Sequence, residues 1–270
     1  MSLSHTVVSV DNGALFYGER DMGHTHTPEF LPIGAGRDSN VVMDAHRPDD
    51  LNPPELCSVT ADLPQFVEGQ RFRLSWKQLL DEVDQARAQG LEIKPALIGP
   101  MSYLWLGHAN DDSFDKLDLL ERLLPEYGEI FGRLAARGVE WIQIDEPILS
   151  TALPQAWKAG FERAYHILQY SPLKKLVATG DGDVRDNLGL AASLPVAGLH
   201  VNLVQEPEQL PSVLDRLPTY KILSLGLEDP KRWHCESSAA PDTFGLAQER
   251  FGDNLWLSGS GNLSSSAQAI

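Results

Sequence analysis

The spacing of short apolar segments is the feature of this sequence that most restricts its fold. Over most of the chain, apolar runs of strand length alternate with segments whose apolar residues repeat at helical spacing. Such alternation favours a parallel sheet with crossover helices, because a tight turn cannot join parallel neighbours. The expected strands lie near residues 30–33, 56–60, 93–98, 141–145, 175–179, 198–202, 222–226 and 255–258. Eight strands are what a (β/α)8 barrel needs, so an α/β fold of this TIM type is predicted.

Three helices are well marked between these strands. The first covers residues 75–90 and opens with a capping box at Ser75. The second covers about 115–137, and we expect Pro125 to kink or divide it. The third covers 154–169. Its apolar and aromatic residues repeat every three to four positions, which predicts core packing and not a cofactor site: Trp157, Phe161, Tyr165 and Leu168.

The N-terminal region has a different composition. Residues 6–10 and 14–17 are strand-like and flank Asn12-Gly13, a pair that tolerates the backbone of a tight turn, so a β-hairpin is expected there. Loop-forming residues dominate the segment that follows. We therefore expect an N-terminal extension over residues 1–29 and a barrel domain over residues 30–270.

The overall charge excludes one class of partner. The chain carries 38 acidic and 22 basic residues, which gives a formal net charge of -16. Such a balance repels phosphate backbones, and no long basic patch offsets it, so nucleic acid is not an expected partner. Two cysteines are too few for a disulfide framework, and no apolar run is long enough for a signal sequence or a membrane span. A cytoplasmic protein is expected.

A pair of carboxylates ends the strand near residues 141–145. Asp145 and Glu146 precede Pro147, and in a barrel the C-terminal strand ends surround the ligand site. Both are therefore candidate ligand-binding residues. The alternative is that one carboxylate caps the following loop and the other is solvated, because adjacent strand residues face opposite ways.

Three further polar residues follow later strands. His200 and Asn202 lie two positions apart on one strand and should face the same way, while Glu228 follows the next strand. They are candidate ligand contacts. Alternatively, His200 is a hydrogen-bonded core residue and Glu228 caps a helix.

A metal site is the least favoured hypothesis. His24 and His26 have the spacing of a metal pair for hydrolysis, but charged and glycine residues precede them where an apolar strand is needed. The remaining ligands would have to come from His46, His200 or His234. A loop or surface position for the pair is favoured, and we expect no metal to be bound.

Several segments resemble a known family in their order and spacing: Pro64-Gln-Phe66, Ser75-Trp-Lys-Gln-Leu79, Lys94-Pro-Ala-Leu-Ile-Gly-Pro100, Leu104-Trp-Leu-Gly107, Trp141-Ile-Gln-Ile-Asp-Glu-Pro147 and Leu153-Pro-Gln-Ala-Trp157. Together they resemble the N-terminal barrel of cobalamin-independent methionine synthase, which methylates homocysteine from methyltetrahydrofolate polyglutamate. The similarity is dense over about residues 64–168 and patchier to about residue 257. The family enzyme has two barrels, and the resemblance implies that its zinc, its homocysteine pocket and most folate contacts belong to the C-terminal one, absent here.

The resemblance also guides the functional expectations. Two strand ends depart from the family pattern, Thr179–Asp183 and Ser258–Ser264. By analogy with a similar strand of the catalytic barrel, Asp145 would hold the amino group of an amino-acid ligand. The first hypothesis is that the chain is a barrel related to methyl transfer and binds an amino acid or a folate. In this hypothesis the chain binds no cofactor of its own and works with a partner that supplies the C-terminal barrel. The alternative is a catalytically silent barrel that acts as a scaffold.

Overall fold

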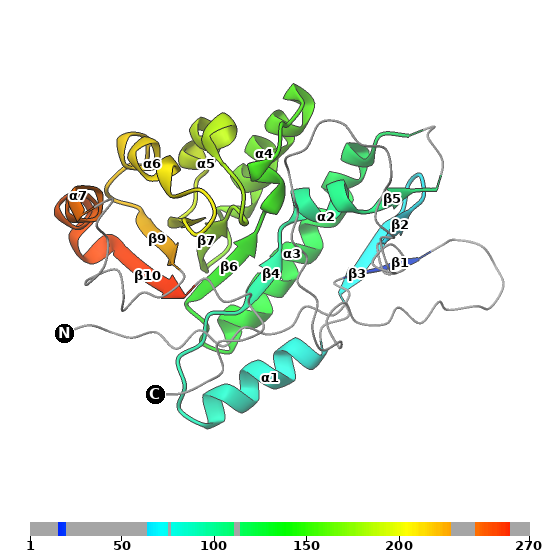
Figure 1. The fold of residues 1–270 in the computed structure, drawn as a ribbon. Coiled ribbons are helices and arrows are strands. Elements are labelled where there is room, and N and C mark those ends of the chain that lie inside the picture. Colours follow the sequence, from blue (N-terminus) through cyan, green and yellow to red (C-terminus); the bar gives the residue numbers. More distant parts are fainter. Residues whose placement is uncertain (1–15, 20–63, 75–76, 111–113, 228–240, 260–270) are drawn as a thin grey trace, which may run out of the picture.

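The largest element of the protein is a six-stranded parallel sheet. The structure, a computed structural model, describes residues 16–19, 64–74, 77–110, 114–227 and 241–259. The strands of the sheet are β4 (Ala96–Ile98), β6 (Trp141–Asp145), β7 (Lys174–Ala178), β8 (Gly198–Asn202), β9 (Ile222–Leu227) and β10 (Leu255–Gly259). Their order is β10-β9-β8-β7-β6-β4, so each strand from β6 onward lies beside the next one in sequence (Figure 1).

The α/β class and the parallel sheet are confirmed. All five strand pairs are parallel, as crossover helices require. The six strands correspond to the six predicted from residue 93 onward. Each was predicted from a short apolar run, and these runs are buried in the sheet. The predicted strands at 30–33 and 56–60 lie outside the described residues.

Helices join these strands and cover one side of the sheet. The α-helices are α1 (Lys77–Ala88), α2 (Pro100–Leu106), α3 (Leu120–Ala136), α4 (Gln155–Leu168), α5 (Leu188–Ser193), α6 (Leu210–Arg216) and α7 (Pro241–Phe251). The 3-10 turns are η2 (Lys116–Leu119), η3 (Pro147–Ser150), η4 (Arg185–Asn187), η5 (Pro207–Gln209) and η7 (Gly252–Asn254). Figure 1 shows α4 to α7 following one another along one side of the sheet. Within the described residues, no helix has both the length and the apolar character to cross a bilayer.

The three predicted helices are present, with one correction. The second is not divided at Pro125; α3 continues through it, and the change in helix type comes earlier, where η2 gives way to α3. Gly90 and Gly138 follow α1 and α3 with a φ of 75°, the left-handed conformation that glycine adopts without strain. Ser75 of the predicted capping box lies outside the described residues.

Two small sheets lie outside the main one. Strand β1 (Phe16–Glu19) pairs antiparallel with β3 (Arg71–Leu74), and β2 (Gln65–Phe66) pairs parallel with β5 (His108–Ala109). The second strand of the expected N-terminal hairpin, residues 14–17, overlaps β1 at residues 16 and 17, and β1 pairs with β3. The first expected strand, residues 6–10, lies outside the described residues.

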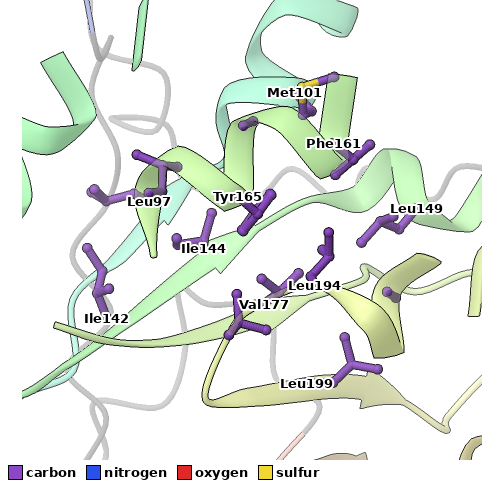
Figure 2. Close-up of a cluster of buried hydrophobic side chains, with 14 of the residues drawn as sticks. Leu97, Met101, Ile142, Ile144, Leu149, Phe161, Tyr165, Val177, Leu194 and Leu199 are labelled. Atoms are coloured by element: carbon purple, nitrogen blue, oxygen red, sulfur yellow. The ribbon is translucent and has the colours of Figure 1, made fainter. Parts of the chain in front are cut away.

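The main core lies between the sheet and the helices. Figure 2 shows strand residues such as Ile144 and Val177 among side chains from α2 and α4. The aromatic stripe of α4 is part of this core, as predicted: Phe161 and Tyr165 have no exposed surface. We call this side of the sheet the outer face, by analogy with a barrel wall.

The opposite side of the sheet, here the inner face, is curved. The rings of Trp141 on β6 and Trp256 on β10 are in edge contact, with centroids 4.8 Å apart. Three strands lie between β6 and β10 in the sheet, and neighbouring strands are about 4.8 Å apart. The two rings can meet only because the sheet bends around this side, as a barrel wall does.

Candidate functional site

A hydrogen-bonded row of polar side chains crosses the inner face beside β4, the last strand of the sheet among the described residues. Lys94, just before β4, donates from Nζ to Oε1 of Gln143 at 2.6 Å. Gln143 in turn donates from Nε2 to Oδ1 of Asp145 at 2.8 Å. Gln143 and Asp145 are alternate residues of β6 and so project from the same face. The row connects a cation to a carboxylate through a neutral amide.

His200 extends the polar row across the sheet. The strand register places Asp145, Ala178 and His200 side by side on β6, β7 and β8, and Ser224 of β9 follows. Ring atom Nδ1 of His200 lies 2.9 Å from Oγ of Ser224. Because Ala178 ends at its Cβ atom, no long side chain separates Asp145 from His200. Asp145 and His200 are both partly exposed, so these two candidate residues lie on one accessible face.

Partial enclosure changes the protonation of these groups. Burial raises the pKa of Asp145 to about 6, against the opposing effects of the Gln143 hydrogen bond and the positive charge of Lys94. Burial lowers the pKa of Lys94 to about 8, opposed by the negative charge of Asp145. Burial, with a smaller contribution from Lys94, lowers the pKa of His200 to about 4. At neutral pH the imidazole is therefore uncharged, and Asp145 is mostly ionised.

Glu146 does not lie on the inner face, which corrects the expectation that both carboxylates open toward a ligand. Its side chain has no exposed surface. It accepts hydrogen bonds from the backbone N–H groups of Met101 and Ser102, at 3.2 and 2.7 Å, and from the hydroxyl of Tyr165 at 3.0 Å. The physical reason is strand alternation, which sends adjacent side chains to opposite faces. Glu146 therefore joins α2 and α4 to the end of β6.

The surroundings of Glu146 are tight and poorly hydrated. Burial raises the pKa of its carboxyl to about 7, although hydrogen bonds from Ser102, Met101 and Tyr165 oppose the shift. Gly99 makes room for it: a Cβ atom at that position would lie 2.1 Å from Cδ of Glu146. The glycine is therefore required by close approach and not by its backbone angles, which are those of an ordinary extended residue.

Asn202 lies beyond His200 at the C-terminal end of β8. Its Nδ2 donates to Oδ1 of Asp181 at 2.6 Å, and its Oδ1 accepts from the backbone N–H of Val204 at 3.0 Å. Asn202 is 9% exposed. Its side chain thus connects the loop that contains Asp181 with the loop that contains Val204 at the strand ends. Its predicted role as a ligand contact stays a prediction.

The remaining sequence-based candidates lie outside the described residues. These are Glu228, His24 and His26. Among the residues that the structure does describe, no three His, Cys, Asp or Glu side chains gather in a way that could hold a metal ion.

Sequence reasoning missed three members of the inner face: Lys94, Gln143 and Ser224. A signal for Gln143 was present, because Gln143 and Asp145 alternate with the apolar Ile142 and Ile144 along β6. That alternation marks one polar face on an otherwise buried strand. Lys94 and Ser224 carry no comparable local signal, since their relevance depends on neighbours 49 and 24 residues away in sequence.

Comparison with known families agrees with this architecture. Residues 63–249 match the family model of the cobalamin-independent synthase N-terminal domain. The chain belongs to this family. The matched range includes Lys94, Gln143, Asp145, His200 and Ser224, so the polar row is part of the family domain.

Solved structures show the same fold. The chain is similar to the Listeria monocytogenes protein assigned as a vitamin-B12-independent methionine synthase, with a TM-score of 0.57, 13% identity and coverage of 75% of this chain and 67% of that one. It is also similar to a B12-independent methionine synthase of a Shewanella species, solved in complex with selenomethionine, with a TM-score of 0.54, 17% identity and coverage of 73% and 63%. The chain thus spans about two thirds of the length of either protein.

Proposed function

We propose that this chain is a methionine-synthase-like barrel that binds a small amine-bearing molecule, of the amino-acid type, on its inner face. Asp145 would act as the counter-ion of the ligand's ammonium group. The observation that carries the proposal is the position of Asp145: it is partly exposed, lies on the inner face and is mostly ionised at neutral pH. Glu146, its neighbour, is wholly buried and already has three hydrogen-bond donors.

The immediate neighbours of Asp145 suit such a ligand. One carboxylate oxygen is held by Gln143, which fixes the orientation of the group. His200 is uncharged at neutral pH and partly exposed, so it offers hydrogen bonds without repelling an ammonium group. The bound selenomethionine of the Shewanella synthase, an amino acid, supports the choice of ligand class.

The proposal further holds that the chain does not complete methyl transfer alone. In the family that it resembles, zinc and homocysteine are held by a second barrel, and activation of a thiol by zinc needs about three protein ligands. The inner-face row offers Lys94, Asp145 and His200 as its ionisable groups and contains no thiol. A separate protein that carries the zinc-bearing barrel would be the partner, and zinc and methyltetrahydrofolate polyglutamate would act there.

Thermal-shift measurements with methionine, homocysteine and folates test the ligand. We expect methionine or homocysteine to raise the melting temperature. At a ligand concentration a hundredfold above Kd, the free energy of unfolding should increase by about 2.7 kcal/mol. Asp145→Asn should abolish the shift. Asp118→Asn, which changes an exposed carboxylate on η2, is the matched control and should retain it.

An activity assay tests the second part. Purified protein with zinc, homocysteine and methyltetrahydrofolate polyglutamate should form no methionine. Methionine formation by the chain alone would show that it is self-sufficient. Absence of any ligand shift, in contrast, would favour the alternative of a scaffold that retains only the fold.

A further inference from the structure

The ammonium group of Lys94 has a different kind of partner from those of Lys116, Lys174, Lys175 and Lys221. Lys174 pairs with the carboxylate of Glu140 at the protein surface. Three others donate to two backbone carbonyl oxygens each, so their ammonium groups are held in place: Lys116, Lys175 and Lys221. Lys94 donates to the neutral side-chain amide of Gln143, and it is partly exposed on the inner face.

These contacts leave the Lys94 nitrogen available for chemistry. A neutral amide favours the ammonium form less than a carboxylate does, because it carries no charge. Burial lowers the pKa of Lys94 to about 8, as it does for Lys175 and Lys221, so a large fraction of the amine is unprotonated under mildly alkaline conditions. Of these three lysines only Lys94 is partly exposed. An unprotonated amine within reach of a proton donor is the arrangement that lysine nucleophiles use.

We propose that Lys94 is a nucleophilic lysine that condenses with the carbonyl group of a small aldehyde or 2-oxo acid to form an imine. The proposal uses the inner face of the proposed function but adds a different chemistry to it. It stands on the position of Nζ, which is one amide away from the carboxyl of Asp145 on a partly exposed face.

The bond changes balance without any oxidant or reductant. The lone pair of Nζ attacks the carbonyl carbon, the carbonyl oxygen takes up one proton and the nitrogen releases one, which gives a carbinolamine. The hydroxyl then takes up a second proton and leaves as water, and the nitrogen releases its second proton as the C=N bond forms. The net reaction is amine plus carbonyl compound to imine plus water.

Asp145 is the group placed to move the proton. Its raised pKa, about 6, lets the ionised carboxylate accept the proton that leaves nitrogen and, once protonated, give it to the departing hydroxyl. Gln143 holds one of its oxygens and at the same time accepts from Lys94. The amide therefore fixes the distance between nucleophile and acid.

Reductive trapping tests this inference in the 270-residue chain. The chain is incubated with pyruvate, or in a second arm with propanal, and sodium borohydride is added to reduce any imine to a stable secondary amine. Peptide mass spectrometry then locates the label. At pH 8 a lysine with a pKa of about 8 has roughly a hundredfold more free amine than an ordinary exposed lysine. We expect at least about ten times more label on Lys94 than on the exposed Lys77 of α1.

Variants separate a chemical role from a structural one. Lys94→Arg should lose the label, whereas Lys77→Arg should keep it at Lys94. Asp145→Asn removes the negative charge that raises the pKa of Lys94, so the pH midpoint of labelling should move below 8 while the maximum rate falls. A residue that only supports the fold would not shift that midpoint.

The outcomes are decisive and distinct from those of the amino-acid proposal. Equal labelling of Lys94 and Lys77 in the wild-type protein, which requires no variant to fold, would overturn the inference. So would a labelling midpoint near that of an exposed lysine. If trapping fails while methionine still raises the melting temperature, the proposed ligand site stands and only the imine chemistry is wrong.

Discussion

The two faces of the sheet contrast most clearly at Asp145 and Glu146, which are neighbours in sequence. On the outer face, Glu146 has no exposed surface and accepts hydrogen bonds from α2 and α4. On the inner face, Asp145 is partly exposed and belongs to the row that includes Gln143 and Lys94. Burial raises the pKa of both carboxyls. The contrast shows that two adjacent carboxylates can have different roles: Glu146 stabilises the fold, and Asp145 is available to a ligand.

Truncation of Glu146 should have the largest effect on stability. Glu146→Ala leaves two backbone N–H groups and the Tyr165 hydroxyl without their acceptor in a buried site. We expect a loss of about 3 to 4 kcal/mol in the free energy of unfolding, measured with urea. At pH 4.5, where Glu146 is protonated, Glu146→Gln keeps the size and one acceptor oxygen and should lose about 1 kcal/mol. Equal stability of Glu146→Ala and the wild type would show that the carboxylate is not structural.

The pH dependence of stability should reveal the same group. The folded pKa of Glu146 is about 7, above its usual 4.5, so its contribution is complete below pH 4.5 and is lost as pH rises to 7. Between pH 4.5 and 7 the free energy of unfolding of the wild type should therefore fall by roughly 3 kcal/mol relative to that of Glu146→Gln, which cannot ionise. Urea unfolding of both proteins at several pH values measures the difference. A constant difference between pH 4.5 and 8 would contradict the shifted pKa.

A methyl group at Gly99 should disturb the outer face more mildly. The added Cβ of Gly99→Ala would lie 2.1 Å from the carboxyl carbon of Glu146, so the carboxylate must move away from α2. We expect a loss of about 2 kcal/mol by thermal or urea unfolding. Gly128→Ala on α3 is the control, because nothing lies within 4 Å of its added Cβ, and it should gain about 0.5 to 1 kcal/mol. A loss at both positions would point to helix geometry and not to crowding at Glu146.

Asp145 should show the smallest effect on stability. Its ionised form is disfavoured in the folded protein, as the raised pKa shows. Asp145→Asn should therefore change the free energy of unfolding at pH 8 by less than about 1 kcal/mol, or increase it slightly. Circular dichroism melting curves measure this change. A large loss of stability would place Asp145 with Glu146 as a structural residue.

The sequence was informative where a strand or helix depends on its own residues. The six strands from residue 93 onward and α4 were predicted because apolar runs and helical periodicity are local signals. The helix is not divided at Pro125, since α3 tolerates a proline near its N-terminal end and the change in helix type comes at Leu119–Leu120 instead.

The site was less predictable because it depends on contacts between distant residues. Asp145 and His200 were each candidates because they lie on predicted strands, but that they share one face became visible only from the register of β6, β7 and β8. Strand alternation predicts that Asp145 and Glu146 face opposite ways. It does not predict that Glu146 accepts hydrogen bonds from α2 and α4, because those partners are distant in sequence. The role of Gly99 and the position of Lys94 depend on partners 47 and 49 positions away, which no local pattern reveals.

The most direct test of the division between the faces is the ligand-induced thermal shift of Asp145→Asn. We predict that this variant melts within a few degrees of the wild type and no longer responds to methionine or homocysteine, which stabilise the wild type. A variant that melts far lower yet keeps the full ligand response would contradict the assignment of Asp145 to a ligand site.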